Sequence, residues 1–298
     1  FTSKDLKNEK VLSAKNDIAV NKLENNGKIV TGKDLIVKDN LINSSKIEAI
    51  GDIKVVSNVI NTGNILTNGS FVSKDVKNSK NISVNKDIDI GNLNNLKNAT
   101  VITNKKININ GELTNIGAIR SLENIKVTGN TINNGDIFTN KNFVTSDLIN
   151  NQKIIAKEKI DIKNLKNSGT IASGGKFTVV GNLENTNNIE TTNLDITGNK
   201  LTNSGSIKAD NISTKVSDIT NDGKILSFNN ISFSNTQNIL NRNEITALKD
   251  IEANNTNLVN SGDIASNGKI LLNNSSITNT KKIASSTIEM KDNKKFDN

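Results

Sequence analysis

The chain has 298 residues, a net charge of +8 at pH 7 and no Pro, Cys, His, Trp or Tyr, so its eight Phe are its only aromatic residues. The absence of cysteine excludes a disulfide framework and a thiolate metal site. The lysines are scattered among acidic residues, which indicates a solvated surface. Nucleic-acid binding would also favour stacking aromatics, and these eight Phe are only 3% of the chain.

The first predicted element of each repeat ends on an asparagine. These anchor asparagines recur about every 18 residues, which is the period of a solenoid. Two places before the anchor stands an apolar residue, as Leu23 does before Asn25, and Thr131 is the one polar exception. We expect the anchors to stack as a structural ladder, and they are Asn8, Asn25, Asn43, Asn61, Asn78, Asn98, Asn115, Asn133, Asn150, Asn167, Asn185, Asn203, Asn221, Asn241, Asn260, Asn279 and Asn298.

The second element begins after a turn. An apolar residue, nearly always Ile, stands four places after the anchor and a small residue two places later, as in Ile29 and Thr31. Glycine often occupies the second place after the anchor, as in Gly27 and Gly63, where we expect a left-handed backbone conformation. The third element is an alternating apolar pair, which again indicates a strand; examples are Ile18 and Val20, Leu35 and Val37, Ile53 and Val55, Ile160 and Ile162, and Phe177 and Val179.

Strands this short are not stable alone, but stacked repeats pair every backbone group and bury continuous apolar columns. The sequence therefore predicts an all-β fold, a right-handed parallel β-helix solenoid of about 16 coils with three short strands each. A leucine-rich repeat is excluded because its period is longer. We expect residues 1–298 to form a single array about 75 to 80 Å long. Because Phe1–Asn8 repeats the middle of a later coil, Phe71–Asn78, we expect a fragment of a longer stalk, uncapped at both ends.

The repeat N-x-G-x-I-x-small, followed by an apolar pair and L-x-N, resembles the filamentous haemagglutinin repeat. Clear copies are Asn61–Thr67 (NTGNILT), Asn203–Ala209 (NSGSIKA) and Asn260–Ser266 (NSGDIAS). This resemblance implies a very large exoprotein, secreted through an outer-membrane partner that a missing amino-terminal domain would engage. It also implies an extracellular location on the cell surface of a Gram-negative bacterium. Members of the family include adhesins, haemolysins and stalks of contact-dependent toxins.

Three functions are compatible with this pattern. The leading hypothesis is a structural shaft that holds distal adhesive or toxic modules away from the cell. The alternative is that the segment itself binds a host glycan or receptor, and a minor alternative is a β-helical carbohydrate-active enzyme. The longest gaps predict only small bulges, at Gly91–Asn95 and Ser234–Asn238, rather than a catalytic groove. Asp87 and Asp89 flank an inward Ile and should face solvent, so no catalytic residue is expected.

The phenylalanines give the only candidate contact residues. Phe71, Phe143, Phe177 and Phe233 fall in phase with the inward columns, whereas Phe138 and Phe228 fall out of phase and are possible contacts. Neither a cofactor nor a metal site is expected, since no His or Cys ligand and no calcium-binding repeat is present. We further expect no membrane span and a monomeric rod.

Overall fold

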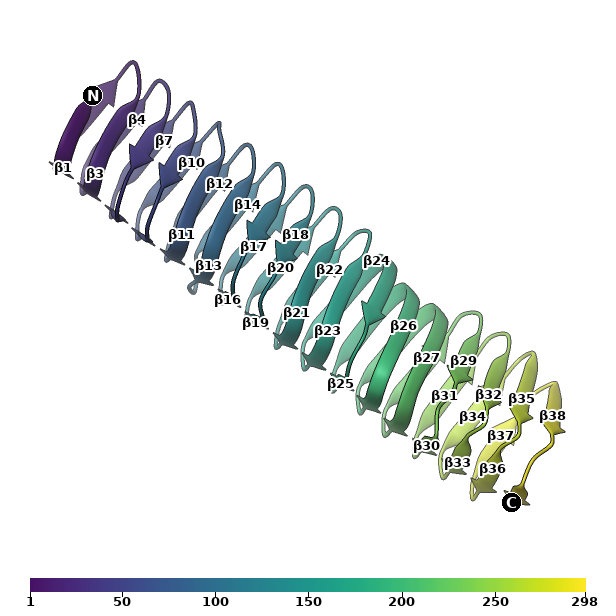
Figure 1. The fold of residues 1–298 in the computed structure, drawn as a ribbon. Helices are drawn as coiled ribbons and strands as arrows, with labels where there is room; N and C mark the ends of the chain where they lie inside the picture. Colours follow the sequence, from purple (N-terminus) through teal and green to yellow (C-terminus); the bar gives the residue numbers. More distant parts are fainter. The chain divides into compact units, whose positions relative to one another are not determined.

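The computed structural model describes residues 1–298, which form a parallel β-solenoid without helices. It has about 16 turns with a spacing of about 18 residues, so the predicted fold class is confirmed. Two compact units can be distinguished, the first made of Phe1–Ser146 and Gln152–Ala156 and the second of Asp147–Asn151 and Lys157–Asn298. Within each unit, successive turns lie side by side (Figure 1).

Most strands have three to five residues, and many turns contain three separate strands. In other turns the segments run together, so that β26 and β27 have 16 residues each. Those of the first unit are β1 (Thr2–Asn8), β2 (Val11–Ala14), β3 (Ile18–Asn25), β4 (Lys28–Thr31), β5 (Leu35–Val37), β6 (Leu41–Asn43), β7 (Lys46–Ala49), β8 (Ile53–Val55), β9 (Val59–Asn61), β10 (Asn64–Thr67), β11 (Phe71–Asn78), β12 (Asn81–Val84), β13 (Ile88–Asn95), β14 (Thr100–Thr103), β15 (Ile107–Ile109), β16 (Leu113–Asn115), β17 (Ala118–Ser121), β18 (Ile125–Val127), β19 (Thr131–Asn133), β20 (Asp136–Thr139) and β22 (Lys153–Ala156). Residues of β21 (Phe143–Asn150) belong to both units. Those of the second unit are β23 (Ile160–Asn167), β24 (Thr170–Val179), β25 (Leu183–Asn185), β26 (Asn188–Asn203), β27 (Ser206–Asn221), β28 (Lys224–Ser227), β29 (Ile231–Ser234), β30 (Asn238–Asn241), β31 (Glu244–Ala247), β32 (Ile251–Asn254), β33 (Asn257–Asn260), β34 (Asp263–Ser266), β35 (Lys269–Asn273), β36 (Ser276–Asn279), β37 (Lys282–Ala284), β38 (Thr287–Lys291) and β39 (Lys295–Asp297).

One turn of the first unit shows how three faces arise. β6, β7 and β8 follow one another around the turn and pair in parallel with β9, β10 and β11 of the next turn. We call the faces A, B and C: face A holds β6 and β9, face B holds β7 and β10, and face C holds β5 and β8. Alternate residues of each strand point inward, and the buried residues of this turn are Leu41, Asn43, Ile47, Ala49, Ile53 and Val55.

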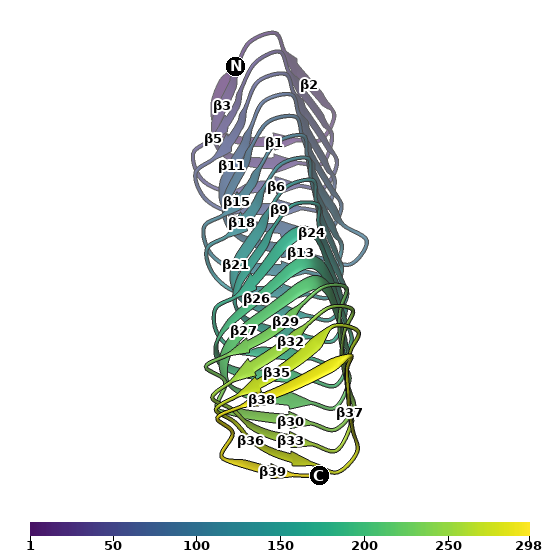
Figure 2. The same cartoon turned by 90° about the vertical axis from the view of Figure 1, so that its right-hand side faces the viewer.

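The same three faces recur in the second unit. Looking along the turns, Figure 2 places β29, β32 and β35 on one side and β30, β33 and β36 on another. The pairing is in register, so Ile231 lies against Ile251 and Ile251 against Ile270. Like side chains therefore pile up in columns, and each fully buried Ile or Leu contributes about 1.5 to 3 kcal/mol of hydrophobic stabilisation.

The aromatic and hydroxyl positions of the core follow from this register. Phe71, Phe143, Phe177 and Phe233 are at most 3% exposed, which confirms their predicted inward orientation. Thr131, the polar exception, is also buried, and its hydroxyl is 2.8 Å from that of Thr145. This hydrogen bond satisfies a group that would otherwise be costly to bury.

The predicted left-handed conformation of the corner glycines is wrong. The only glycine with positive φ is Gly198, so Gly27 and Gly63 have ordinary backbone angles. Their small size serves a close approach instead, because a Cβ at Gly63 would lie 1.9 Å from the carbonyl oxygen of Ser45 in the preceding turn. Turn-to-turn spacing, not backbone conformation, thus favours glycine at this corner.

Candidate functional site

The buried asparagines at the end of the face A strands form the main polar constellation. Asn61 is a typical member: its Oδ1 accepts a hydrogen bond from Nδ2 of Asn43 at 2.8 Å, and its own Nδ2 donates to Oδ1 of Asn78 at 2.8 Å. The same Nδ2 lies 2.9 Å from the carbonyl oxygen of Gly63 and 3.2 Å from that of Asn81. Each amide therefore joins three turns and closes its own corner.

In the first unit this ladder runs through consecutive turns with Nδ2–Oδ1 distances of 2.8 to 2.9 Å. Every amide donates toward the carboxyl-terminal side, so the side-chain dipoles align head to tail and strengthen one another. Its members are Asn8, Asn25, Asn43, Asn61, Asn78, Asn95, Asn115 and Asn133.

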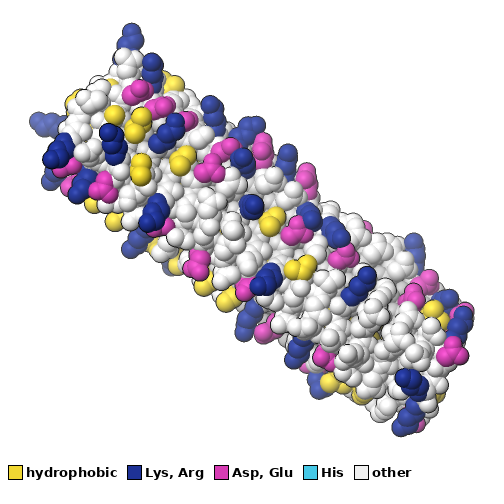
Figure 3. All heavy atoms as spheres, in the orientation of Figure 1, with side chains coloured by type: hydrophobic (Ala, Val, Ile, Leu, Met, Phe, Trp, Pro, Cys, Tyr) yellow, Lys and Arg dark blue, Asp and Glu magenta, His cyan; other side chains and the backbone are white.

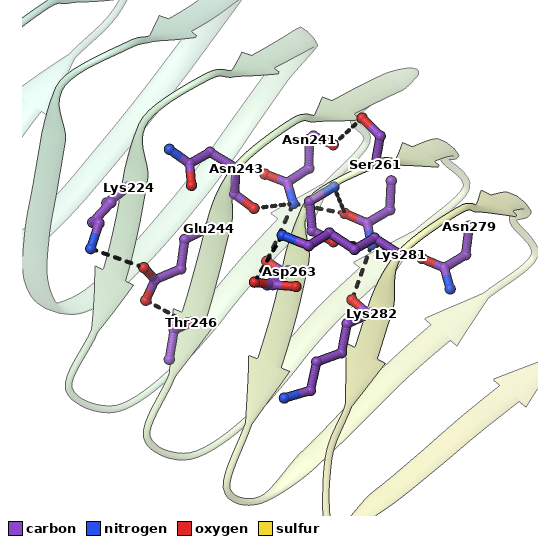
Figure 4. Close-up of polar contacts among 12 residues, drawn as sticks. Lys224, Asn241, Asn243, Glu244, Thr246, Ser261, Asp263, Asn279, Lys281 and Lys282 are labelled. Atoms are coloured by element: carbon purple, nitrogen blue, oxygen red, sulfur yellow. Dashed lines mark hydrogen bonds and ion pairs between the residues drawn. The ribbon is translucent and has the colours of Figure 1, made fainter.

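The second unit has a ladder of the same polarity. Figure 4 shows Asn241 and Asn279 at the same corner, with Asn241 Nδ2 directed toward the carbonyl oxygens of Asn243 and Asp263 at 3.1 and 3.3 Å. The Nδ2–Oδ1 distances in this unit are 2.6 to 2.8 Å. Its members are Asn150, Asn167, Asn185, Asn203, Asn221, Asn241, Asn260, Asn279 and Asn298.

One predicted anchor, Asn98, is wrong. The ladder passes from Asn78 through Asn95 to Asn115, with Nδ2–Oδ1 distances of 2.9 and 2.8 Å. Asn98 is exposed and has φ of 63°, in a turn closed by the hydrogen bond from Ala99 N–H to the Leu96 carbonyl. The predicted bulge at Gly91–Asn95 is wrong for the same reason, since these residues lie in β13.

The predicted bulge at Ser234–Asn238 contains a real insertion, and the sequence reasoning missed that it recurs. Asn235, Asn255 and Asn274 all have positive φ and occupy the corner between faces C and A. Asn274 Nδ2 donates to Oδ1 of Asn255 at 2.6 Å, which makes a second, exposed asparagine contact between turns. The sequence did contain a signal for these insertions, because successive ladder asparagines are 19 or 20 residues apart toward the carboxyl-terminal end.

Hydroxyl groups at the end of face B were also missed. The sequence showed only that this column is small. In the structure, Thr31, Thr191 and Ser227 donate from their hydroxyl oxygens to carbonyl oxygens of the preceding turn at 2.7 to 2.8 Å. Buried hydroxyls thus tie one turn to the next at a second corner.

Carboxylates do the same at the start of face C in the first unit. Oδ1 of Asp17, Asp34 and Asp52 accepts the backbone N–H of the following turn at 2.8 to 3.0 Å. Lys54 Nζ lies 3.1 Å from Oδ2 of Asp52 and 3.8 Å from Oδ2 of Asp34. The backbone N–H of Ser70 is the main reason that the pKa of Asp52 is lowered, and Asp52 in turn raises the pKa of Lys54.

The two candidate contact residues differ in their surroundings. Phe138 is half-buried and stacks between Arg120 and Ile155 of the adjacent turns, beside a hollow of about 180 Å³. Phe228 is 46% exposed and lies next to Leu248, which is 45% exposed, on a corner of the second unit. Both phenylalanines are accessible at the surface.

The acidic pair considered for catalysis lies at the start of β13, Asp87 just before the strand and Asp89 on its outer side. Asp87 and Asp89 flank the buried Ile88, and their partners in the next turn are Lys106 Nζ at 3.6 Å and Asn108 Nδ2 at 2.5 Å. No group of three or more acidic residues is arranged to hold a metal ion. The structure also has no helix of the length and apolarity that crossing a membrane requires.

Charged residues of both signs are interspersed over the visible surface of each unit, with apolar side chains between them, several of which lie close together toward the amino-terminal end (Figure 3). Ion pairs such as Arg242–Asp222 at 2.9 Å join neighbouring turns, but both partners are largely exposed. Exposed pairs contribute about 0 to 1 kcal/mol each. Among side-chain contacts between turns, the buried ladder therefore contributes more to stability than the exposed ion pairs.

Comparison with known proteins identifies no relative. No family model, curated protein or solved structure matches this chain. What the chain does is therefore argued from its own contacts.

Proposed function

We propose that this chain is the structural shaft of a secreted, cell-surface adhesin of the filamentous haemagglutinin type. In this role it holds distal adhesive or toxic modules away from a Gram-negative cell. The proposal includes export through an outer-membrane partner and assigns the chain no catalytic step. It also includes one continuous array over residues 1–298.

A single observation carries the proposal: the buried polar groups of the repeat are used to join turns. In the second unit, Asn203 Oδ1 binds Asn185 Nδ2 and Asn203 Nδ2 binds Asn221 Oδ1, each at 2.8 Å. Hydroxyl and backbone groups at the other corners also form hydrogen bonds to the adjacent turn. Because each turn contacts only its neighbours, length can be added turn by turn without a new core.

The alternative function, binding of a host glycan or receptor by this segment, has one specific observation in its favour. Phe138 and Arg120 border the hollow of about 180 Å³ on the first unit. Aromatic and arginine side chains are enriched at protein interfaces. Replacing Phe138 therefore provides the means of deciding between the two functions.

The deciding experiment is titration of the purified chain against host cells and sulfated glycans at low and high salt. A shaft predicts weak binding that disappears as salt screens the net positive charge. Saturable, salt-resistant binding that Phe138→Ala abolishes would support the alternative and contradict a purely structural role. Val180→Ala is the control, because it shortens an exposed apolar side chain of the second unit that is not a candidate contact.

A further inference from the structure

The outer side of face A in the first unit carries charges in a symmetric order. Each face A strand presents two outward residues, three places and one place before the ladder asparagine. In β3 these are Lys22 and Glu24, and three turns later in β11 they are Asp75 and Lys77. The two strands therefore carry opposite charges at corresponding positions.

The two turns between them are uncharged on this face. Their outward residues are Asn40 and Ile42, then Asn58 and Ile60. Ile42 and Ile60 are 45% and 44% exposed and are register neighbours in β6 and β9. The order along the face is thus charged, neutral, neutral and oppositely charged.

Two surface hollows flank the centre of this four-turn pattern. One, of about 480 Å³, is bordered by Lys22, Glu24 and Ile42, and the other, of about 440 Å³, by Ile60, Asp75 and Lys77. Each hollow thus contains one of the two exposed isoleucines beside a charged turn. The first is also bordered by Asp5 and Lys7, and the second by Glu112. An isoleucine on a facing surface could enter either hollow.

We propose that this part of face A pairs with the same part of a second copy of the chain, with the two stacks of turns running antiparallel. A twofold axis between the turns of Ile42 and Ile60 places Ile42 opposite Ile60 of the second copy and Asn40 opposite Asn58. It also places Lys22 opposite Asp75 and Glu24 opposite Lys77, so that all ionic contacts are between opposite charges.

A parallel arrangement matches this face less well. It would put Lys22 opposite Glu24, but it would also put the amide of Asn40 against the apolar Ile42. The antiparallel arrangement pairs amide with amide and isoleucine with isoleucine. Neighbouring strands lie about 4.8 Å apart and outward side chains alternate regularly, so one match brings the others into register.

The contact is small. With the axis between β6 and β9, the six face A strands from β1 to β13 overlap with their counterparts. Six turns of a three-residue strand give an interface on the order of 600 Å² in total, which is typical of a weak and transient association. We therefore expect dilute protein to be monomeric and pairing to require a high local concentration. On the proposed function, shafts anchored to one cell run parallel, so antiparallel pairing would join shafts of two facing cells.

Sedimentation equilibrium of the full chain tests the pairing independently of that cellular role. Wild-type protein should show a concentration-dependent dimer that weakens with salt. Glu24→Lys and Lys77→Glu each create like-charge contacts twice in the symmetric dimer, and each should weaken dimerisation about 5- to 30-fold. The double variant restores opposite charges in the antiparallel dimer and should return to within about threefold of wild type.

The control is Glu190→Lys, which makes the same charge change on an exposed residue of face B in the second unit and should leave dimerisation unchanged. Melting curves of all variants establish that they are folded. A chain that stays monomeric at every concentration overturns the proposal, as does a double variant that dimerises as poorly as the single ones.

Cysteine cross-linking provides a second measurement, since the chain has no cysteine of its own. Under mild oxidation, a mixture of Ile42→Cys and Ile60→Cys should give a cross-linked dimer, whereas either variant alone should give little. Equal cross-linking in all three samples would contradict the antiparallel arrangement. A failure of the shaft function would leave both solution experiments unaffected.

Discussion

At the scale of single residues, the ladder asparagine is suited to its position because its amide has both donors and an acceptor. A buried amide is costly only when its hydrogen bonds are missing. Asn203 is fully buried, yet its Oδ1 and Nδ2 both have partners in adjacent turns. A leucine of similar size would fill the space but leave those partners unpaired.

Replacing Asn203 with Leu should therefore lower the free energy of unfolding by about 2 to 6 kcal/mol, because Nδ2 of Asn185 and Oδ1 of Asn221 each lose a buried hydrogen bond. Thermal and urea denaturation measure this loss. Asn199→Leu is the control, since Asn199 is exposed in the same turn and its replacement should change stability by less than about 0.5 kcal/mol. Equal melting of Asn203→Leu and wild type would contradict the ladder.

The corner carboxylates give a dependence on pH. The pKa of Asp52 is lowered in the fold, mainly by the backbone N–H of Ser70. A lowered folded-state pKa means that the contribution of Asp52 is present above its ordinary pKa and is lost as pH falls through the folded value. Stability of the chain should therefore decrease on acidification below about pH 4.

Asp52→Asn should reduce this acid sensitivity while preserving the corner. An amide oxygen can still accept the N–H of Ser70, as Asn124 Oδ1 does from the backbone N–H of Asn142 at 3.2 Å. Melting temperatures at pH 7 and pH 3 give the measurement, with exposed Asp5→Asn as the control. An Asp52→Asn chain as sensitive to acid as wild type would show that the carboxylate does not contribute in this way.

At the scale of the strand and turn, no element is stable alone. Strands of three or four residues gain their hydrogen bonds from the turns on either side, and the turn is the smallest unit that can be added or removed. β25 (Leu183–Asn185) pairs with β23 on one side and β26 on the other. The regular spacing of inward residues from one turn to the next, more than any single contact, specifies the fold.

Deleting residues 186–203 removes one whole turn and joins Asn185 to the next corner. The ladder, the apolar columns and the register are all retained, so this variant should fold and melt cooperatively near the wild-type temperature. Deleting only residues 186–194 is the control, because it removes half a turn and shifts inward residues out of phase. Circular dichroism and thermal melting distinguish them, and similar loss of structure in both would contradict turn-by-turn assembly.

The sequence was sufficient to predict the fold class and the inward columns because period-two alternation and the 18-residue spacing are local signals. It was insufficient where the repeat could be aligned with the sequence in two ways. Leu93-x-Asn95 and Leu96-x-Asn98 both match the repeat, and the choice depends on Leu93 pairing with Val76 and Leu113 in adjacent turns. The hydroxyl and carboxylate corners were missed because their partners lie a full turn away.

The candidate contact surfaces were predictable only in part, because their residues come from different turns that lie far apart in sequence. The face A pairing depends on which residues point outward in four successive turns, and Lys22 and Asp75 are 53 residues apart in sequence. No local motif marks them. Phe138, by contrast, was identified because a phenylalanine out of phase with the core is conspicuous in a chain with eight aromatic residues.

At the scale of the whole molecule, the proposal is that the two units continue one stack. Each has its own ladder with the same polarity and the same three faces. Repeat arrays of this kind gain stability from nearest-neighbour contacts, so their extent is set by the number of turns. A shaft requires an array whose length can be set by the number of turns in this way.

Small-angle X-ray scattering of dilute, monomeric chain tests this claim most directly. One continuous stack of about 16 turns would be about 75 to 80 Å long, with a radius of gyration of roughly 24 Å. A compact globule of the same length of chain would have a radius of gyration of about 19 Å. We predict the larger radius of gyration, with a narrow and constant cross-section. A compact particle, or two units joined at an angle, would contradict the account.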